Sequence, residues 1–481
     1  MIKQCQQVLL FFLLSPGMAF ATSAVVSSEH DPVAAVLLWV TLIFSFAIFG
    51  RYLARCLHQP GVLGELLMGV LLGNICYYFG VPLIVVLREG AAIFNIIAAM
   101  LGGTPLADAV NNSIPNAHYA TQVTTALSGI HGIELIKVSY VLDMFSRYGV
   151  IFLLFMVGLE SSVQELKNTG RESIQVALIG IIAPILLGLL VALLLVPEAS
   201  FKANLFVAAT LSATSIGITA RVLSEMKKLR TREARTILGA AMLDDILGLI
   251  ILAIVSSIVI NGHVDMLMIA QVIASTIIFF AGALWLGPKF LRYAVRYVTF
   301  LEMWEAKLFV SFLFVMMLSW FATLVQLASI IGAFAAGMII NDSFFESGDK
   351  SRQHILKIKD LVAPLEFLLA PLFFMLIGIQ VKLESFFDWH VLFMASGLIM
   401  AAVIGKLLSG LGGTRNDDRL LIGIGMLPRG EVGLVFASIG RTLGVMSDQL
   451  FSAIILMVIV TTFIVPPLLK MRYAKNEKAR V

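Results

Sequence analysis

The sequence has little charge and few cysteines. Only 13% of its 481 residues are Asp, Glu, Lys or Arg, and 59% are hydrophobic. A soluble domain carries roughly 25% charged residues, so this composition predicts a protein of the lipid bilayer. The three cysteines, Cys5, Cys56 and Cys76, lack metal-ligand spacing, so neither a zinc site nor a disulfide framework is expected. There is no basic patch with interleaved aromatics and no Gly-rich nucleotide fingerprint, so neither a nucleic-acid partner nor a cofactor is expected.

The first residues resemble a secretory signal. A basic start at Lys3 precedes the apolar run 8–14 and an Ala-x-Ala end at 19–21. We predict a signal peptide over 1–21, with an uncleaved extra membrane helix as the alternative. In either case, the residues near Asp31 are expected on the outer side.

Hydrophobic stretches of spanning length recur along the rest of the chain. The sequence therefore predicts an all-α polytopic membrane protein, with a membrane domain over 32–472 and a short cytoplasmic tail over 473–481. The ninth stretch is short and contains two glycines. The pattern indicates about thirteen spans, near 33–57, 61–87, 139–164, 173–196, 203–225, 234–260, 265–288, 307–326, 328–341, 362–381, 390–411, 419–441 and 448–471.

Lysines and arginines are distributed unequally between alternate connections. If the N-terminus is outside, the inner connections hold basic clusters such as 227–235 and 350–359. The outer connections hold few: Arg88, Lys137, Lys202, Lys382 and Arg441. The positive-inside rule then predicts an external N-terminus and a cytoplasmic C-terminus. The expected location is a bacterial inner membrane.

The predicted outer segment 88–138 is unusually long. Its apolar run, 91–101, is too short to span and is expected to lie at the interface or to re-enter. We interpret the segment as an external insertion within the membrane domain. Its sequence does not indicate a role.

Asp244 and Asp245 are adjacent in the middle of the apolar stretch 237–254. A carboxylate at membrane depth costs at least ~2.5 kcal/mol, and like-charged neighbours repel each other. Such a pair is tolerated where it faces a wet cavity or pairs with cations. The two aspartates therefore predict a site for a monovalent cation, a proton, or each in turn.

Two other spans are expected to be broken near the midplane. Hydroxyls and a glycine are concentrated in 209–219, and 425–433 combines Pro428 with glycines, Arg429 and Glu431. Broken helices form ion sites in many transporters, and Ser and Thr can satisfy the freed backbone groups. These spans are seven apart and run in opposite directions, which predicts inverted repeats of spans one to six and eight to thirteen. The alternatives are close packing through small residues for the first span and a kinked helix with interfacial charges for the second.

Lys406 lies within the eleventh span, in an otherwise apolar run. A buried ammonium requires a carboxylate, and the aspartate pair is the nearest explanation. The alternative is a lysine that extends to the inner interface.

Taken in order, these features resemble the cation:proton antiporter superfamily, in the branch of the NapA-type sodium/proton antiporters. The order is a hydroxyl-rich broken helix, an Asp-Asp helix, a Lys helix and a Pro-Arg-Gly-Glu helix. Three further segments are similar: 61–73, 152–160 and 331–339. The signal-like N-terminus and the 88–138 insertion depart from the family pattern.

The resemblance implies a six-helix core domain that moves against a dimerisation panel, in a homodimer that exchanges sodium for protons by alternating access. Asp245 would be the principal carboxylate for the cation and the proton, and Asp244 would pair with Lys406 when no cation is bound. The residues implied beside the ion are Thr214 and Ser215, and those implied to stabilise the second crossover are Pro428, Arg429 and Glu431.

Three other functions are compatible with parts of the pattern. A sodium-coupled solute symporter could share the broken-helix fold, but the buried acid pair with a lysine is less expected there. A cation channel would conduct without proton counterflow. A membrane receptor or assembly protein would not need the acid pair.

Overall fold

The computed structural model describes residues 33–480 except 58, 60, 91, 115–116, 161–169, 198, 216–218, 220–221, 224–225, 227, 229–230, 262–265, 299, 326, 346–355, 416 and 430. Within these residues the chain is helical and contains no strand. The predicted signal peptide, 1–21, lies outside them.

The helices are α3 (Val33–Cys56), α4 (Gly61–Tyr78), α5 (Pro82–Arg88), α6 (Ala92–Leu101), α7 (Leu106–Ser113), α8 (Ala117–Ser128), α9 (Gly132–Glu160), α11 (Arg171–Leu195), α12 (Phe201–Ser212), α14 (Arg232–Asn261), α15 (Met266–Tyr297), α16 (Met303–Leu324), α17 (Ser329–Ile339), α18 (Ile358–Ile379), α19 (Trp389–Ser409), α20 (Arg419–Gly425), α21 (Glu431–Thr442) and α22 (Asp448–Arg480), with short 3-10 turns η1 (Asp342–Phe344), η2 (Leu383–Phe387) and η3 (Gly410–Gly412).

In the part of the chain that the structure describes, 10 helices are long and apolar enough to cross a membrane. They are α3, α4, α9, α11, α14, α15, α16, α18, α19 and α22. The α5–α6 pair, bent by 98°, raises the number to up to 11 if it is one broken span. In the other three predicted stretches, the described residues form shorter helices: α12, α17 and the α20–α21 pair.

The predicted span 61–87 is wrong as a single helix. The chain ends α4 at Tyr78, turns at Gly80 and starts α5 at Pro82. Gly80 has a φ of +68°, a conformation that glycine adopts without steric cost. Proline at the first helical position then favours the start of a new helix.

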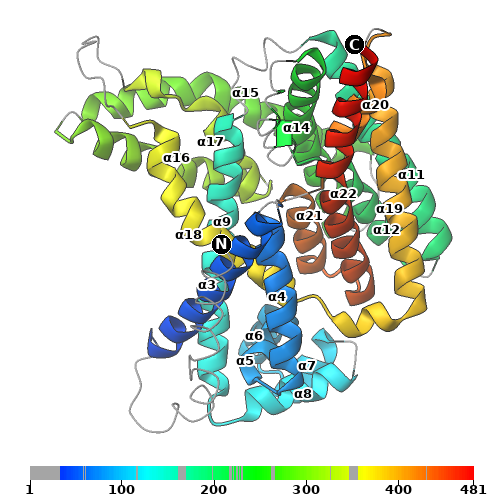
Figure 1. The fold of residues 1–481 in the computed structure, drawn as a ribbon. Helices are drawn as coiled ribbons and strands as arrows, with labels where there is room; N and C mark the ends of the chain where they lie inside the picture. Colours follow the sequence, from blue (N-terminus) through cyan, green and yellow to red (C-terminus); the bar gives the residue numbers. More distant parts are fainter. Residues whose placement is uncertain are drawn as a thin grey trace.

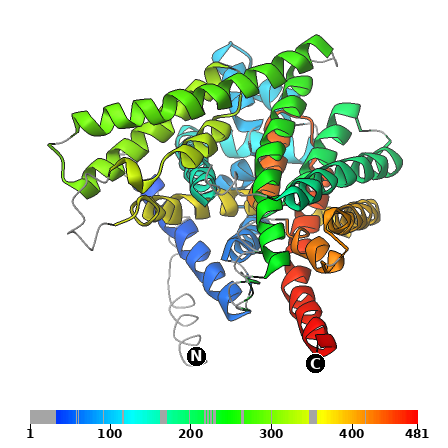
Figure 2. The same cartoon turned by 90° about the horizontal axis from the view of Figure 1, so that it is seen from above.

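Most of the helices pack in two groups. One group contains α3, α4, α9, α16, α17 and α18, and the other contains α11, α12, α14, α19, α20, α21 and α22. Helix α15 contacts members of both groups, through α14 on one side and α16 and α17 on the other. Figures 1 and 2 show the second group on one side of the molecule and α15 and α16 on the opposite side.

The segment 88–138 forms a small helical layer at one end of the molecule. Helices α5, α6, α7 and α8 share a separate apolar cluster that includes Val86, Ile96, Val110 and Val123. Figure 1 shows this layer at the end opposite to the C-terminus. Residues 92–101 of the predicted apolar run form the short helix α6, within that layer.

Candidate functional site

Asp244 and Asp245 lie in the middle of the continuous helix α14. Their exposed fractions are 1% and 4%, so both carboxylates are removed from bulk solvent. Adjacent residues on a helix do not share a face, because successive side chains are turned by about 100°. The two acids can therefore have different partners.

Helix α19 places Lys406 against Asp244. The Lys406 Nζ lies 3.1 Å from Asp244 Oδ1 and 3.2 Å from Asp244 Oδ2, and Lys406 has an exposed fraction of 0%. The contact predicted between these residues is therefore present, and the alternative of a lysine at the inner interface is wrong. Helix α11 packs closely beside this pair, since a Cβ on Gly180 would lie 3.6 Å from Nζ, an ordinary van der Waals distance.

The hydroxyl-rich span is interrupted, as the sequence predicted. Helix α12 ends at Ser212, and residues 213–215 are not helical. The hydroxyls of Thr210 and Ser212 donate to carbonyls of their own helix. The Thr214 hydroxyl is buried and has no hydrogen-bond partner among the described residues.

The second predicted break is also present. Helix α20 ends at Gly425 and α21 begins at Glu431, with non-helical backbone between them. The Ser215 N–H donates to the Pro428 carbonyl over 2.9 Å, so the two breaks are joined by a backbone hydrogen bond. The Arg429 guanidinium donates to the Ala213 carbonyl. The broken helices therefore meet at their interruptions.

Arg429 brings a second buried cation to this region. Its exposed fraction is 0%, which excludes the alternative of an interfacial charge. Arg429 interacts electrostatically with Asp244, and Lys406 interacts with both aspartates. Two carboxylates and two cations are thus buried together, and their formal charges balance. The side chain of Glu431 lies outside the described part of the structure.

Two threonines stabilise the second break: Thr219, from the hydroxyl-rich segment 209–219, and Thr462, which was not identified from the sequence. The Thr219 hydroxyl donates to the Gly425 carbonyl over 2.7 Å. The Thr462 hydroxyl, from α22, donates to the Arg429 carbonyl. A break in a helix leaves carbonyls without helical partners, and these hydroxyls satisfy two of them. The sequence signal that could have identified Thr462 is the Thr-Thr pair at 461–462 within an apolar span.

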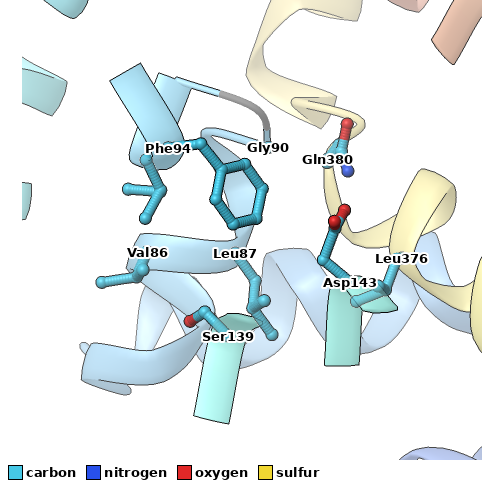
Figure 3. Close-up of a pocket in the computed structure, with 9 residues that line it drawn as sticks. Val86, Leu87, Gly90, Phe94, Ser139, Asp143, Leu376 and Gln380 are labelled. Atoms are coloured by element: carbon cyan, nitrogen blue, oxygen red, sulfur yellow. The ribbon is translucent and has the colours of Figure 1, made fainter. Parts of the chain in front are cut away.

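A cavity of about 20 Å³ lies elsewhere, between α5, α6, α9 and α18. Figure 3 shows Asp143 and Gln380 on one side of it and Phe94 on the other. Such a volume holds about one water molecule. No group of three His, Cys, Asp or Glu side chains suited to a metal ion occurs among the described residues. The buried charges of α14 and α19 are therefore the best candidate site.

Comparison with known proteins finds a family match and several relatives of this chain. The family model for the transmembrane sodium/hydrogen exchangers matches residues 120–471. The high-affinity Na⁺/H⁺ antiporter NhaS3 of Synechocystis sp. is 34% identical over 95% of this chain and 95% of its own length. The Na⁺/H⁺-K⁺ antiporter GerN of Bacillus cereus is 33% identical, over 72% of this chain and 86% of its own.

The fold is also similar to that of a solved structure. The sodium proton antiporter MjNhaP1 of Methanocaldococcus jannaschii at pH 8 superimposes with a TM-score of 0.56. The match covers 92% of this chain and 98% of that protein, with 16% sequence identity. At this identity the likeness concerns the fold alone.

Proposed function

The chain belongs to the sodium/hydrogen exchanger family, and from this premise we propose that its buried aspartates carry the exchange of sodium for protons. It is a multi-pass membrane antiporter and not an enzyme. This assignment sets aside the symporter, channel and receptor alternatives. The observation that supports the proposed site is the charge-balanced group of Asp244, Asp245, Lys406 and Arg429, buried where two broken helices meet.

In the proposed mechanism, Asp245 binds either a proton or a monovalent cation. An ionised carboxylate attracts a cation, whereas a protonated one does not, so the two substrates compete for one site. Asp244 holds Lys406 by an ion pair while the cation is absent. Thr214 and Ser215, at the first break, would supply oxygen ligands. Competition at a single site that opens alternately to each side gives exchange without a separate coupling device.

We further propose that the short helices complete thirteen crossings. Helix α12 with the residues after it, helix α17 and the α20–α21 pair would be the fifth, ninth and twelfth. The inverted repeats would then be spans one to six and eight to thirteen. The group with α11 to α14 and α19 to α22 would be the moving core, and the group with α3, α4 and α16 to α18 the dimerisation panel.

The proposed orientation places the N-terminus outside and the C-terminus in the cytoplasm of a bacterial inner membrane, after removal of residues 1–21. The layer of α5 to α8 would then face the outside, as expected for an external insertion. The proposed assembly is a homodimer.

Proton flux in sealed proteoliposomes tests the exchange. A pH-sensitive dye is trapped inside, and sodium, lithium or potassium is added outside in turn. We expect an inward gradient of sodium to drive proton efflux that persists when the membrane potential is clamped. Cation uptake without proton movement would contradict the proposal and would favour a channel.

A further inference from the structure

Lys382 lies in the connection between α18 and α19 and is not part of the aspartate site. It is completely buried. Its Nζ lies 2.6 Å from Asp448 Oδ2 and 2.9 Å from Glu89 Oε1. The ring of Tyr119, on α8, covers the ammonium, with Nζ 3.6 Å from the ring centroid. Burial of a lysine at this depth requires such partners.

Two hydrogen bonds attach the segment around Lys382 to α4. The Asn74 side chain donates to the Val381 carbonyl over 2.9 Å, and its Oδ1 accepts from the Leu383 N–H over 3.1 Å. The backbone on both sides of Lys382 is thus attached to α4, a member of the first helix group (α3, α4, α9 and α16 to α18).

Arg441, in the last turn of α21, makes contacts at the same place. Its guanidinium donates to Asp448 Oδ1 over 2.9 Å and to the carbonyls of Arg88 and Gln380 over 2.9 and 3.1 Å. Arg441 and Asp448 belong to the second helix group, whereas Arg88 and Gln380 adjoin the first. The Lys382–Asp448 ion pair and the Arg441 hydrogen bonds therefore join the two helix groups.

The Arg88 side chain links the 3-10 turn η2 to α4 and α5. It donates to Asn74 Oδ1 over 3.0 Å and to Glu384 Oε2 over 2.8 Å. Burial acts to raise the pKa of Glu384, but a backbone hydrogen bond and Arg88 hold it below its usual value, so this acid is ionised at neutral pH. Because η2 packs against α19 and α22, these contacts add to those of Lys382 and Arg441 between the two helix groups.

We propose that Lys382, Arg441 and Asp448 form an outer gate for the exchange reaction, closed in this structure. The three are positioning residues: they hold the second helix group against the first and must separate when the aspartate site opens to the outside. The proposal rests on the proposed function, because it requires that the two groups move against each other.

The chemistry of these contacts suits a gate. The Asp448 side chain is 34% exposed and that of Arg441 is 9% exposed, so both lie near solvent. When the two helix groups separate, water can form hydrogen bonds with these charged side chains in place of their ionic partners. This limits the free-energy cost of opening. Helix α8 adds Tyr119, whose hydroxyl donates to Glu384 over 2.9 Å and whose ring shields Lys382. This contact gives the 88–138 segment a role in closing the gate.

Reversible cross-linking tests the gate. Lys382→Cys and Asp448→Cys are combined in a chain in which Cys5, Cys56 and Cys76 are replaced, and the pair is bridged with a short bifunctional methanethiosulfonate. We expect the bridge to lower sodium-driven proton flux by about tenfold or more, because gating motions limit turnover in many transport and catalytic cycles. Reduction should restore the flux, which excludes misfolding as the cause.

The matched control bridges Asp143→Cys to Arg147→Cys, an ion pair one turn apart on α9 within the first group. This bridge should leave the flux unchanged. Full flux with the Lys382–Asp448 bridge, verified by mass spectrometry, overturns the gate while leaving the proposed function intact. Absence of flux in the unmodified wild type overturns the proposed function itself.

A second measurement separates gating from stability. Lys382→Met should change the apparent KM for sodium on one face of the membrane by about tenfold relative to the other face, because it shifts the population of outward-open protein. Lys382→Arg should restore the wild-type ratio. Equal changes on both faces, with loss of folded protein, would assign Lys382 a structural role only.

Discussion

At the scale of single residues, the pairing of Lys406 with Asp244 makes the buried charge tolerable. The ammonium and the carboxylate are 3.1 Å apart, and neither reaches solvent. When one partner of such a pair is removed, the other is left as an uncompensated charge, which typically costs ~3–5 kcal/mol.

We therefore predict that Lys406→Ala lowers the melting temperature markedly in cation-free detergent buffer, with a loss of ~3–5 kcal/mol in stability. Adding Asp244→Asn to this variant should recover part of the loss, since no stranded carboxylate is left. A double-mutant cycle on thermal unfolding measures the coupling. Strictly additive changes would mean that the two residues do not interact in the folded protein.

A second prediction concerns Thr462, whose hydroxyl satisfies the Arg429 carbonyl at the break before α21. Thr462→Val keeps the shape but strands that carbonyl, which should cost ~1–3 kcal/mol and slow sodium-driven flux. Thr461→Val is the matched control, because the Thr461 hydroxyl donates only to carbonyls of its own helix. Equal effects of the two substitutions on unfolding and flux would argue against a special role for Thr462.

The sequence could predict the charged residues of the site and the Asp244–Lys406 pair, but not the hydroxyl of Thr462 that satisfies a backbone carbonyl there. Asp244, Asp245, Lys406 and Arg429 are visible because ionised groups are rare and costly in apolar spans. Thr462 is not, since threonine is common in such helices and its partner is a backbone carbonyl 33 residues away along the chain.

At the scale of helices, the glycine-containing segments that suggested the family are packing surfaces. A Cβ on Gly337 of α17 would lie 2.2 Å from the Phe155 carbonyl oxygen of α9, and one on Gly158 would lie 2.3 Å from the Phe334 carbonyl oxygen. Helices α9 and α17 therefore approach each other backbone to backbone.

Gly337→Ala should accordingly push α17 away from α9 and destabilise the protein by ~1–3 kcal/mol, because the clash is with backbone. Gly282→Ala on α15 is the control, since no described atom lies within 4 Å of the added Cβ. It should be neutral or slightly stabilising, and thermal unfolding of both variants checks the difference. A Gly337→Ala variant as stable as the control would be inconsistent with this packing.

The two helix breaks were predictable because proline, glycine and hydroxyls interrupt otherwise apolar runs. The ends of some helices were less predictable from the sequence. Helix α15 continues past the predicted end at 288 to Tyr297, and Lys289 there lies 3.6 Å from the centroid of the Trp285 ring. Hydropathy detects only the apolar part of a helix, so extensions made of charged residues are missed. Likewise α22 continues through most of the predicted tail, to Arg480.

At the scale of the whole molecule, the distribution of lysine and arginine predicts which end faces outside. In a chain in which Cys5, Cys56 and Cys76 are replaced, a cysteine at Thr121 on α8 should react with a membrane-impermeant maleimide added to intact cells. A cysteine at Lys475, near the end of α22, should react only after permeabilisation. The opposite pattern would reverse the orientation and assign the Lys382–Asp448 gate to the inner side.

The whole-molecule expectation of about thirteen spans depended on hydropathy together with the interruptions. The ten long helices follow directly from apolar runs that exceed the bilayer thickness. The packing of these helices into two groups depends on contacts between distant segments, which no local pattern specifies. For the layer of α5 to α8, the sequence likewise predicted an outer location but not the helices or their packing.

The most direct test of the central claim is sodium-driven proton flux in proteoliposomes containing Asp245→Asn, compared with wild type at equal protein content. Asparagine keeps the size of the side chain but can neither ionise nor take up a proton. We predict that exchange falls to the level of empty liposomes while the variant remains folded, as shown by its melting temperature and gel-filtration profile. Flux close to that of wild type would show that Asp245 is not the carrier, and the proposed site would be wrong.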